Sequence, residues 1–227
     1  MMIIKSNHCY ISVALTVMLL YTGTLFAASA TEVISLQADK LEHIQFKKIT
    51  ANRISYQDQQ LQIDVDNSAS ILMLPFDTVK QISQVTFEWR SESGPLSKDL
   101  QHELERSGDD AVFKLGLLLK SDDDTLNPFV PAWLKQVREL LKFPSEEMIY
   151  LVAGARHPAG ERWLSPYNKR ITMVSVASRE IGSGWRQSTF QSEQALNVVA
   201  LWLMADGDNT HAEFGVTIKN IVLKKSD

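Results

Sequence analysis

The sequence has only one cysteine, Cys9, among its 227 residues. Because a disulfide needs two cysteines, no intramolecular disulfide can form, and the core alone must hold the fold together. Cys9 also precedes the long apolar run near the amino terminus instead of following it. It is therefore badly placed to carry a lipid on a processed amino terminus.

Clustered positive charge is absent as well. The chain carries 23 Lys and Arg against 27 Asp and Glu, a formal net charge of −4, and no basic block. Binding to nucleic acid depends on Lys and Arg side chains gathered along the phosphate backbone. The composition argues against a nucleic-acid partner.

The familiar catalytic motifs are also missing. The stretch HELER at 102–106 resembles a zinc-binding H-E-x-x-H but ends in Arg106, so the second zinc ligand is lost. There is no G-x-S-x-G, phosphate-binding loop or dinucleotide fingerprint. His157, near Glu161, is the remaining acid/base candidate, although GARHPAG around it is more typical of a turn.

The first 30 residues have the pattern of a signal peptide. Lys5 precedes an apolar run over Ile11–Phe26, and Ala28-Ser29-Ala30 supplies the small residues of a cleavage site. The run is shorter than the ~20 residues of a spanning helix. Cleavage after Ala30 leaves 227 − 30 = 197 residues, a single domain over 31–227 without cysteine. We predict a periplasmic or secreted protein with no membrane span after processing.

The carboxy-terminal part has the clearest strand pattern. From Ala212 to Ile218 apolar and polar residues alternate, which predicts a strand with one wet face. Val198–Met204 is continuously apolar and predicts a strand buried on both faces. Asp206–Thr210 between them is rich in turn-forming residues, so the two strands are expected to form a hairpin.

Short apolar segments separated by Asn, Asp, Gly and Ser predict an all-β fold, an antiparallel, jelly-roll-like β-sandwich. One amphipathic helix, Pro131–Phe143, is inserted and has apolar residues at helical spacing. The remaining predicted strands are Ile44–Ile49, Arg53–Tyr56, Leu61–Val65, Ser70–Leu74, Val85–Arg90, Val112–Lys120, Met148–Ala153 and Arg170–Ala177.

Several stretches together resemble an uncharacterised bacterial family, the domain of unknown function with serial number three-zero-four-seven. The resemblance covers roughly Ala38 to Leu223. It rests on FEWR, GDDAVFKLGLLL, ERWLSPYNKRITMVSV, GSGW and NVVALWLMADGDNT, in that order along the chain. It implies an exported, β-rich domain and no established reaction.

The acidic loop after Met204 has three interpretations. Asp206, Asp208 and Asn209 offer hard oxygen ligands, which a calcium-like divalent cation requires. An EF-hand is excluded, because the positions for its glycine and glutamate hold His211 and Thr217. Alternatively, the same side chains cap a turn or contact a ligand.

Carboxylates and loop aromatics suggest the ligand class. A sugar presents an apolar face to an aromatic ring and hydroxyls to charged groups. The candidate ligand-binding residues, besides the acidic loop, are Asp109 and Asp110 before a strand, Arg162, Trp163 and Tyr167 in one loop-like stretch, and Trp185. Packing into the core is the alternative for the tryptophans.

The sequence therefore favours a non-catalytic, exported binding module for glycan or another envelope component. Two alternatives stay open. Paired carboxylates could serve a carbohydrate-active hydrolase or lyase. The predicted helix could instead dock onto a partner in an assembly or structural protein of the envelope.

Overall fold

The computed structural model describes residues 30–95, 97–122 and 132–226. The predicted signal peptide, except Ala30, and Pro131 at the start of the predicted helix lie outside these ranges. Within them, a 12-stranded sheet runs in the order β3-β4-β12-β5-β11-β6-β7-β9-β8, with β1, β2 and β10 at its sides. The pairing is antiparallel except between β7 and β9. The predicted all-β, antiparallel class is confirmed.

The strands have the following bounds: β1 Thr31–Val33, β2 Glu42–Gln45, β3 Arg53–Gln57, β4 Gln60–Asp66, β5 Ala69–Arg90, β6 Ala111–Lys120, β7 Ser145–Ala153, β8 Arg162–Leu164, β9 Ile171–Ser175, β10 Ala177–Gly182, β11 Trp185–Asp206 and β12 Glu213–Lys225. The helices are α1 Leu100–Glu103 and α2 Ala132–Leu140, with 3₁₀ turns at Ala38–Lys40 and Arg106–Gly108. The predicted helix is confirmed as α2. Within the described ranges, no helix is long and apolar enough to cross a membrane.

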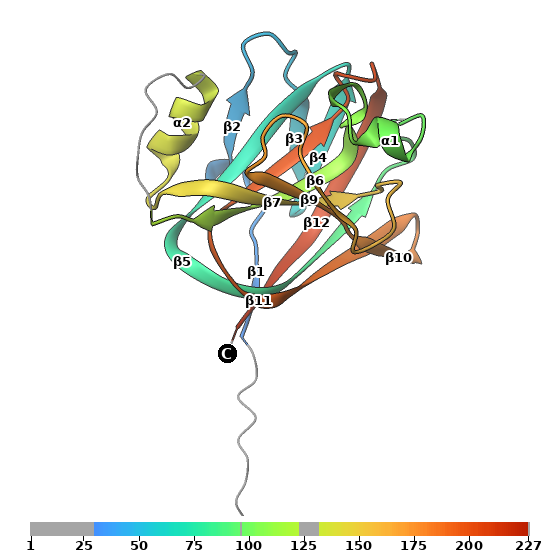
Figure 1. Cartoon of the computed structure of the whole chain (residues 1–227). Coiled ribbons are helices and arrows are strands. Elements are labelled where there is room, and N and C mark those ends of the chain that lie inside the picture. Colours follow the sequence, from blue (N-terminus) through green and yellow to red (C-terminus); the bar gives the residue numbers. More distant parts are fainter. Residues whose placement is uncertain (1–29, 96, 123–131, 227) are drawn as a thin grey trace, which may run out of the picture.

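Two strands, β5 and β11, hold the sandwich together. Each is 22 residues long, and Figure 1 shows both sweeping round the lower edge of the molecule. Their register shifts between Gln191 and Leu196 and between Val198 and Ala200. Such bulges let a strand bend sharply. One half of each strand therefore belongs to one layer and the other half to the opposite layer.

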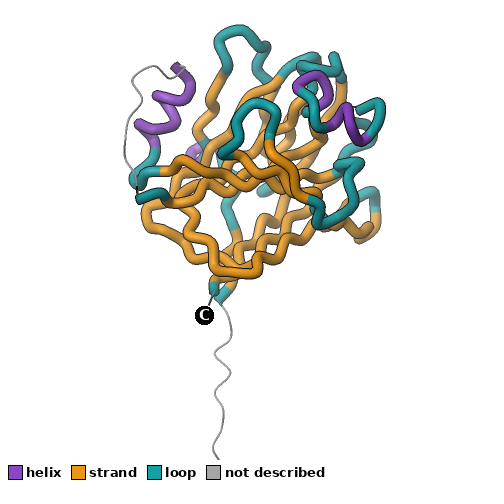
Figure 2. Tube along the Cα trace, viewed as in Figure 1, coloured by secondary structure: helices purple, strands orange, loops and turns teal. Residues whose placement is uncertain are grey.

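We define the first layer as β2, the start of β5, the end of β11, β6, β7, β9 and β8. The second layer is β1, β3, β4, β12, β10 and the other halves of β5 and β11. The separately predicted strands Ser70–Leu74 and Val85–Arg90 are thus two parts of β5 in different layers. The tube in Figure 2 shows the strands forming the body and loops closing its upper end.

The hairpin predicted around Asp206–Thr210 is wrong. The end of β11 pairs with β5 and β6 in the first layer, whereas β12 begins by pairing with β4 in the second layer. The loop therefore crosses between layers. Local turn chemistry gave no sign of this, because the partners of the two strand ends, β5 and β6 for β11 and β4 for β12, come from distant parts of the sequence.

Apolar side chains gather on both faces of the first layer. The inner core, between the layers, contains Leu201 and Leu203 of β11 and Leu115 and Leu117 of β6. The alternate residues of the same strands face outward, among them Trp202, and form an outer cluster beneath α2. This explains why Val198–Met204 is continuously apolar, as predicted for a strand buried on both faces.

Candidate ligand-binding pocket

A cavity of about 370 Å³ lies between α2 and the outer face of the first layer. Its apolar walls include Trp133, Leu134 and Val137 of α2, and its other end is lined by polar side chains. The volume falls within the usual range of small-molecule sites, about 300–1,000 Å³. An apolar wall with a few convergent polar groups is the usual composition of such sites.

Gly116 of β6 allows the aromatic wall to form. It pairs with Trp202 on one side and Tyr150 on the other. A Cβ at this position would lie 2.8 Å from Met148 Sδ, 3.0 Å from Trp202 Cβ and 3.1 Å from Tyr150 Cε1. The ring centroids of Trp202 and Tyr150 are 6.4 Å apart, and Trp133 of α2 meets Trp202 edge-on at 6.0 Å. Without a side chain at 116, the two rings can cross over the strand.

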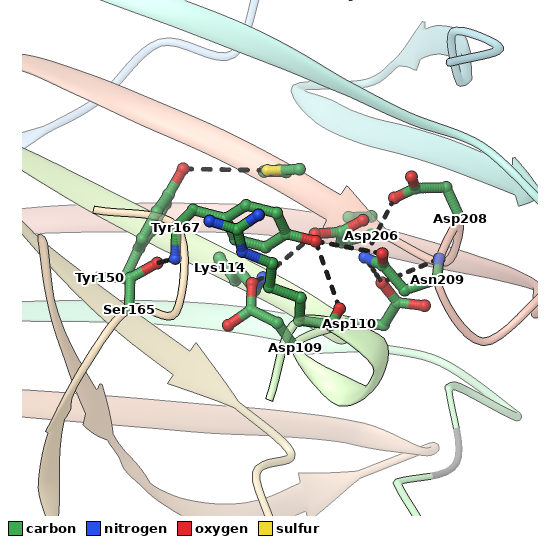
Figure 3. Close-up of polar contacts among 12 residues, drawn as sticks. Asp109, Asp110, Lys114, Tyr150, Ser165, Tyr167, Asp206, Asp208 and Asn209 are labelled. Carbon is green, nitrogen blue, oxygen red and sulfur yellow. Dashed lines mark hydrogen bonds and ion pairs between the residues drawn. The ribbon is translucent and has the colours of Figure 1, made fainter. Parts of the chain in front are cut away.

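A buried ion-pair triad closes the polar end. Lys114 of β6 is 2 % exposed, and its Nζ donates to Asp109 Oδ2 at 2.8 Å and Asp206 Oδ2 at 3.1 Å (Figure 3). Burial alone would lower the pKa of Lys114, but the two carboxylates outweigh it and raise the pKa above its ordinary value. Lys114 therefore stays charged and neutralises part of the acidic end.

The acidic end of the cavity is formed by Asp109, Asp206 and Asp208. Burial raises the pKa of Asp206 well above its ordinary value, Lys114 opposes the rise, and Asp208 and Asp110 add to it. The Tyr150 phenol nearby is also buried, which raises its pKa and keeps it neutral. Without counting Asp206, the Lys114 ammonium still faces two carboxylates, those of Asp109 and Asp208.

Asp110 holds the acidic loop in place. Its Oδ1 accepts from the Asn209 side chain at 2.8 Å, and its Oδ2 accepts from Thr210 N at 2.6 Å and Thr210 Oγ1 at 2.7 Å. The Tyr167 hydroxyl lies 3.1 Å from Asn209 Oδ1 (Figure 3). These bonds tie the loop after β11 to the start of β6 and to the loop between β8 and β9. The turn interpretation of this loop is thus supported, and the same turn places Asp208 and Asn209 on the cavity.

Three buried polar atoms of the cavity walls have no hydrogen-bond partner within the described part of the chain. They are Asp109 Oδ1, Asp206 Oδ1 and Trp202 Nε1. Their residues are 7 %, 3 % and 5 % exposed, respectively. An unpaired buried polar atom costs about 1–3 kcal/mol, so natural proteins rarely leave several together without a further partner. All three belong to residues that line one cavity.

The residues suit a calcium-like ion poorly. Asp110, Asp206 and Asp208 bring ligand oxygens within 4.8 Å of one another. However, both oxygens of Asp110 accept hydrogen bonds from the loop, and Asp206 Oδ2 is paired with Lys114. Calcium requires 6–8 oxygen ligands. The Lys114 ammonium already acts as the local cation.

The structure brings together six of the predicted site residues: Asp109, Asp110, Tyr167, Asp206, Asp208 and Asn209. The other three lie outside the cavity walls. Arg162 is exposed on β8. Trp163 packs on the outer cluster and stacks on His157 at 4.6 Å. Trp185 lies in the second layer between the cations Arg90 and Lys219.

The acid/base candidate named from the sequence, His157, is 6 % exposed and has structural partners. Its Nδ1 lies 3.1 Å from Glu161 Oε1 and its Nε2 lies 3.2 Å from the Leu100 carbonyl oxygen. Glu103 Oε2 accepts from the His157 backbone N–H. The ring is thus held between α1 and the β8 region, away from the cavity.

Sequence reasoning missed Lys114, Gly116, Tyr150, Trp133 and Trp202 as site residues. One signal was present for two of them. In AVFKLGLLLK, a lysine and a glycine interrupt an otherwise apolar strand at alternate positions, so they share one face. A charge and a glycine on a buried face indicate a buried ion pair and a close approach of large neighbours.

The fold and the cavity define a β-sandwich protein with a ligand-sized pocket on one face. Residues 39–222 match the family described as Protein of unknown function (DUF3047), and the chain belongs to this family. The resemblance stated from the sequence is confirmed. No curated protein matches the chain.

Solved structures with a similar chain course include carbohydrate-binding modules. The family 11 module of a cellulosomal cellulase of Clostridium thermocellum has a TM-score of 0.43 and 7 % identity, covering 88 % of this chain and 97 % of its own. A family 29 module has a TM-score of 0.40 and 10 % identity, covering 86 % and 88 %. A xylan-binding module, CBM86, of Roseburia intestinalis has a TM-score of 0.36 and 11 % identity, covering 87 % and 97 %. The ligands of these modules do not indicate what this chain binds.

Proposed function

We propose that the protein is a non-catalytic module that binds a glycan in the cavity beneath α2. The observation that carries the proposal is the cavity itself, where the aromatic wall of Trp133, Trp202 and Tyr150 meets the acidic end. A sugar ring offers an apolar C–H face to such a wall and hydroxyl donors to carboxylates. Both chemistries are present within one site.

The roles differ from those expected for the loop aromatics. Trp133 and Trp202 take the place of Trp163 and Trp185 as apolar contacts, because only the former line the cavity. Tyr167 keeps its predicted role at the rim, where it is 51 % exposed. Asp206, Asp208 and Asn209 orient the polar groups of the ligand.

Titration calorimetry with a set of neutral and charged oligosaccharides tests this proposal. The variant Trp133→Leu removes the partly exposed ring of α2 and is expected to abolish or strongly weaken binding. Trp185→Leu is the matched control, since it removes a tryptophan outside the cavity. Absence of saccharide binding by the wild-type protein, or equal losses in the two variants, would contradict the proposal.

Hydrolysis of a glycosidic bond is a second candidate function. It is favoured by the raised pKa of Asp206 beside Asp208, because a raised pKa moves a carboxyl toward the range in which it can act as a general acid. Release of reducing ends from a bound oligosaccharide, lost in Asp208→Asn with binding retained, would establish it. Asp110→Asn is a poor test, because Asp110 holds the loop and its loss would lower stability as well.

The assembly alternative has less support. The apolar residues of α2 face the first layer, where Val137 is 3 % exposed and joins the outer cluster. The helix thus has its partner within the chain. Charge substitutions on its outer face that dissolve a complex would restore this alternative.

We also propose that the protein is exported to the periplasm or the medium. β1 begins at Thr31, the first residue after the predicted cleavage site, and pairs with β12. Processing after Ala30 would therefore leave the sheet complete. Amino-terminal sequencing of the mature protein is expected to begin at Thr31, and an unprocessed chain in the cytoplasm would contradict export.

A further inference from the structure

The acidic end of the cavity carries more negative charge than its lysine balances. Asp109 and Asp208 alone outnumber the single buried ammonium, that of Lys114, and Asp206, whose raised pKa favours its neutral form, is not needed for this excess. Lys114 uses one oxygen of Asp109 and one of Asp206. A ligand at this end therefore meets an excess of carboxylate in a partly buried site, where a charge acts more strongly than in bulk water.

The hydrogen-bond acceptors at the acidic end also outnumber the donors. Asp109 Oδ1 and Asp206 Oδ1 are buried acceptors without a donor among the described residues. Asp208 Oδ1 accepts a long hydrogen bond of 3.4 Å from Asn209 Nδ2. At these carboxylates the acceptor oxygens therefore outnumber the donors that reach them.

Acidic sugars and neutral sugars fit the acidic end less well than sugars that carry an ammonium group. A uronic acid or phosphorylated sugar would add negative charge beside three carboxylates and be repelled. A neutral sugar would supply hydroxyl donors but leave the charge unbalanced. A primary ammonium supplies three donors and a positive charge in one compact group.

We propose that the ligand is an amino sugar, with its free ammonium held at the acidic end between Asp206 and Asp208 and its ring against Trp133 and Trp202. This inference rests on the proposed glycan-binding function and names the substrate class of that site. The Lys114 ammonium keeps Asp109 and Asp206 in place, and the ammonium of the ligand donates to Asp206 Oδ1 and to Asp208. Binding then supplies the donors that the carboxylates lack.

Three tetrasaccharides with the same β-1,4 linkage test the inference by titration calorimetry. They are the tetramers of glucosamine, N-acetylglucosamine and glucose, which differ only at carbon 2. The glucosamine tetramer is expected to bind at least about tenfold more tightly than the other two, because only its ammonium makes charge-assisted hydrogen bonds to the carboxylates.

The variant Asp208→Asn keeps the size of the side chain and removes one charge, so the preference for the amine is expected to fall several-fold. Glu213→Gln changes the net charge equally at an exposed position of β12 in the second layer and should leave the preference intact. Raising the salt concentration should weaken binding of the amine more than binding of the glucose tetramer.

The outcomes separate the two proposals. If the neutral tetramers bind as tightly as the amine, or if Glu213→Gln matches Asp208→Asn, the amino-sugar inference is wrong while glycan binding stands. If the acetylated tetramer binds most tightly, the inference is also wrong. If none of the three binds, both proposals fail. Because the comparison of ligands uses the wild-type protein, it does not depend on the variant folding.

Discussion

The two faces of the first layer differ although the same strands build both. On the inner face, Phe113, Leu115 and Leu117 of β6 pack into a core made of apolar side chains. On the outer face, the intervening Lys114 and Gly116 lie beside an ion pair and an open cavity. Well-filled apolar packing stabilises, whereas a buried charge is retained only with its partners. The inner face therefore serves stability, and the outer face holds the site at which we propose recognition.

The largest loss of stability is expected from removing the Lys114 charge on the outer face of the first layer. Lys114→Met would leave Asp109 and Asp206 buried without their cation, at a cost of about 3–5 kcal/mol in the free energy of unfolding. Leu115→Ala on the inner face would cost a similar amount, about 2–5 kcal/mol, by leaving a void. Urea denaturation of both variants measures the two costs.

The stability lost in these two variants should respond differently to second substitutions. Adding Asp109→Asn and Asp206→Asn to Lys114→Met removes the unpaired charges and is expected to recover much of the stability. The same pair of substitutions added to Leu115→Ala should recover none of it. Equal behaviour of the two backgrounds would mean that the triad is not the source of the cost.

A moderate loss of stability is expected from adding a side chain at Gly116, beneath the aromatic wall of the cavity. Gly116→Val would push against Met148, Trp202 and Tyr150 and cost about 1–3 kcal/mol by overpacking. It should also close part of the cavity and abolish ligand binding. Gly160→Ala is the control: its φ of +90° makes a side chain strained, but its Cβ would meet no atom within 4 Å. That variant should lose stability and keep binding, as thermal melts and calorimetry would show.

A smaller change in the free energy of unfolding is expected from the titration of Asp206. The folded pKa of Asp206 lies well above its unfolded value near 3.8, so the folded state holds this proton more firmly. As pH rises from below 3.8 through the folded pKa, the unfolded state loses the proton first, and the contribution of Asp206 to stability falls. The charges that face Asp206 are Lys114, Asp110 and Asp208, and Lys114 stays protonated throughout this window.

The difference in unfolding free energy between the wild type and Asp206→Asn isolates this contribution. It should decrease with rising pH across that window and be constant above it. A difference that increases with pH would show that the pKa of Asp206 is lowered in the folded state. Asp77→Asn, at an exposed surface pair with Lys142, should give the opposite slope, because its folded pKa is lowered.

The same contrast explains what could be predicted from the sequence. Alternation and turn residues predicted most strands, because burial on one face is a local pattern. The continuity of β5 was missed, since its middle, Pro75–Gln84, is polar and bent and resembles a loop. The acidic loop was recognised from its composition, but Trp202 and Tyr150 read as core residues. Only the pairing of β6 with β7 and β11 shows that they meet over Gly116.

The smallest change in melting temperature is expected from adding calcium. Three carboxylates come within 4.8 Å of one another, yet Lys114 and the loop donors occupy much of their coordinating capacity. A ligand present at 100 times its Kd raises the free energy of unfolding by about 2.7 kcal/mol. We therefore expect added calcium to leave the melting temperature unchanged, and the glucosamine tetramer to raise it. If calcium raised the melting temperature and Asp208→Asn removed the effect, the outer face would be a metal site. The cation bound by its carboxylates would then be a metal ion and not the ammonium of a ligand.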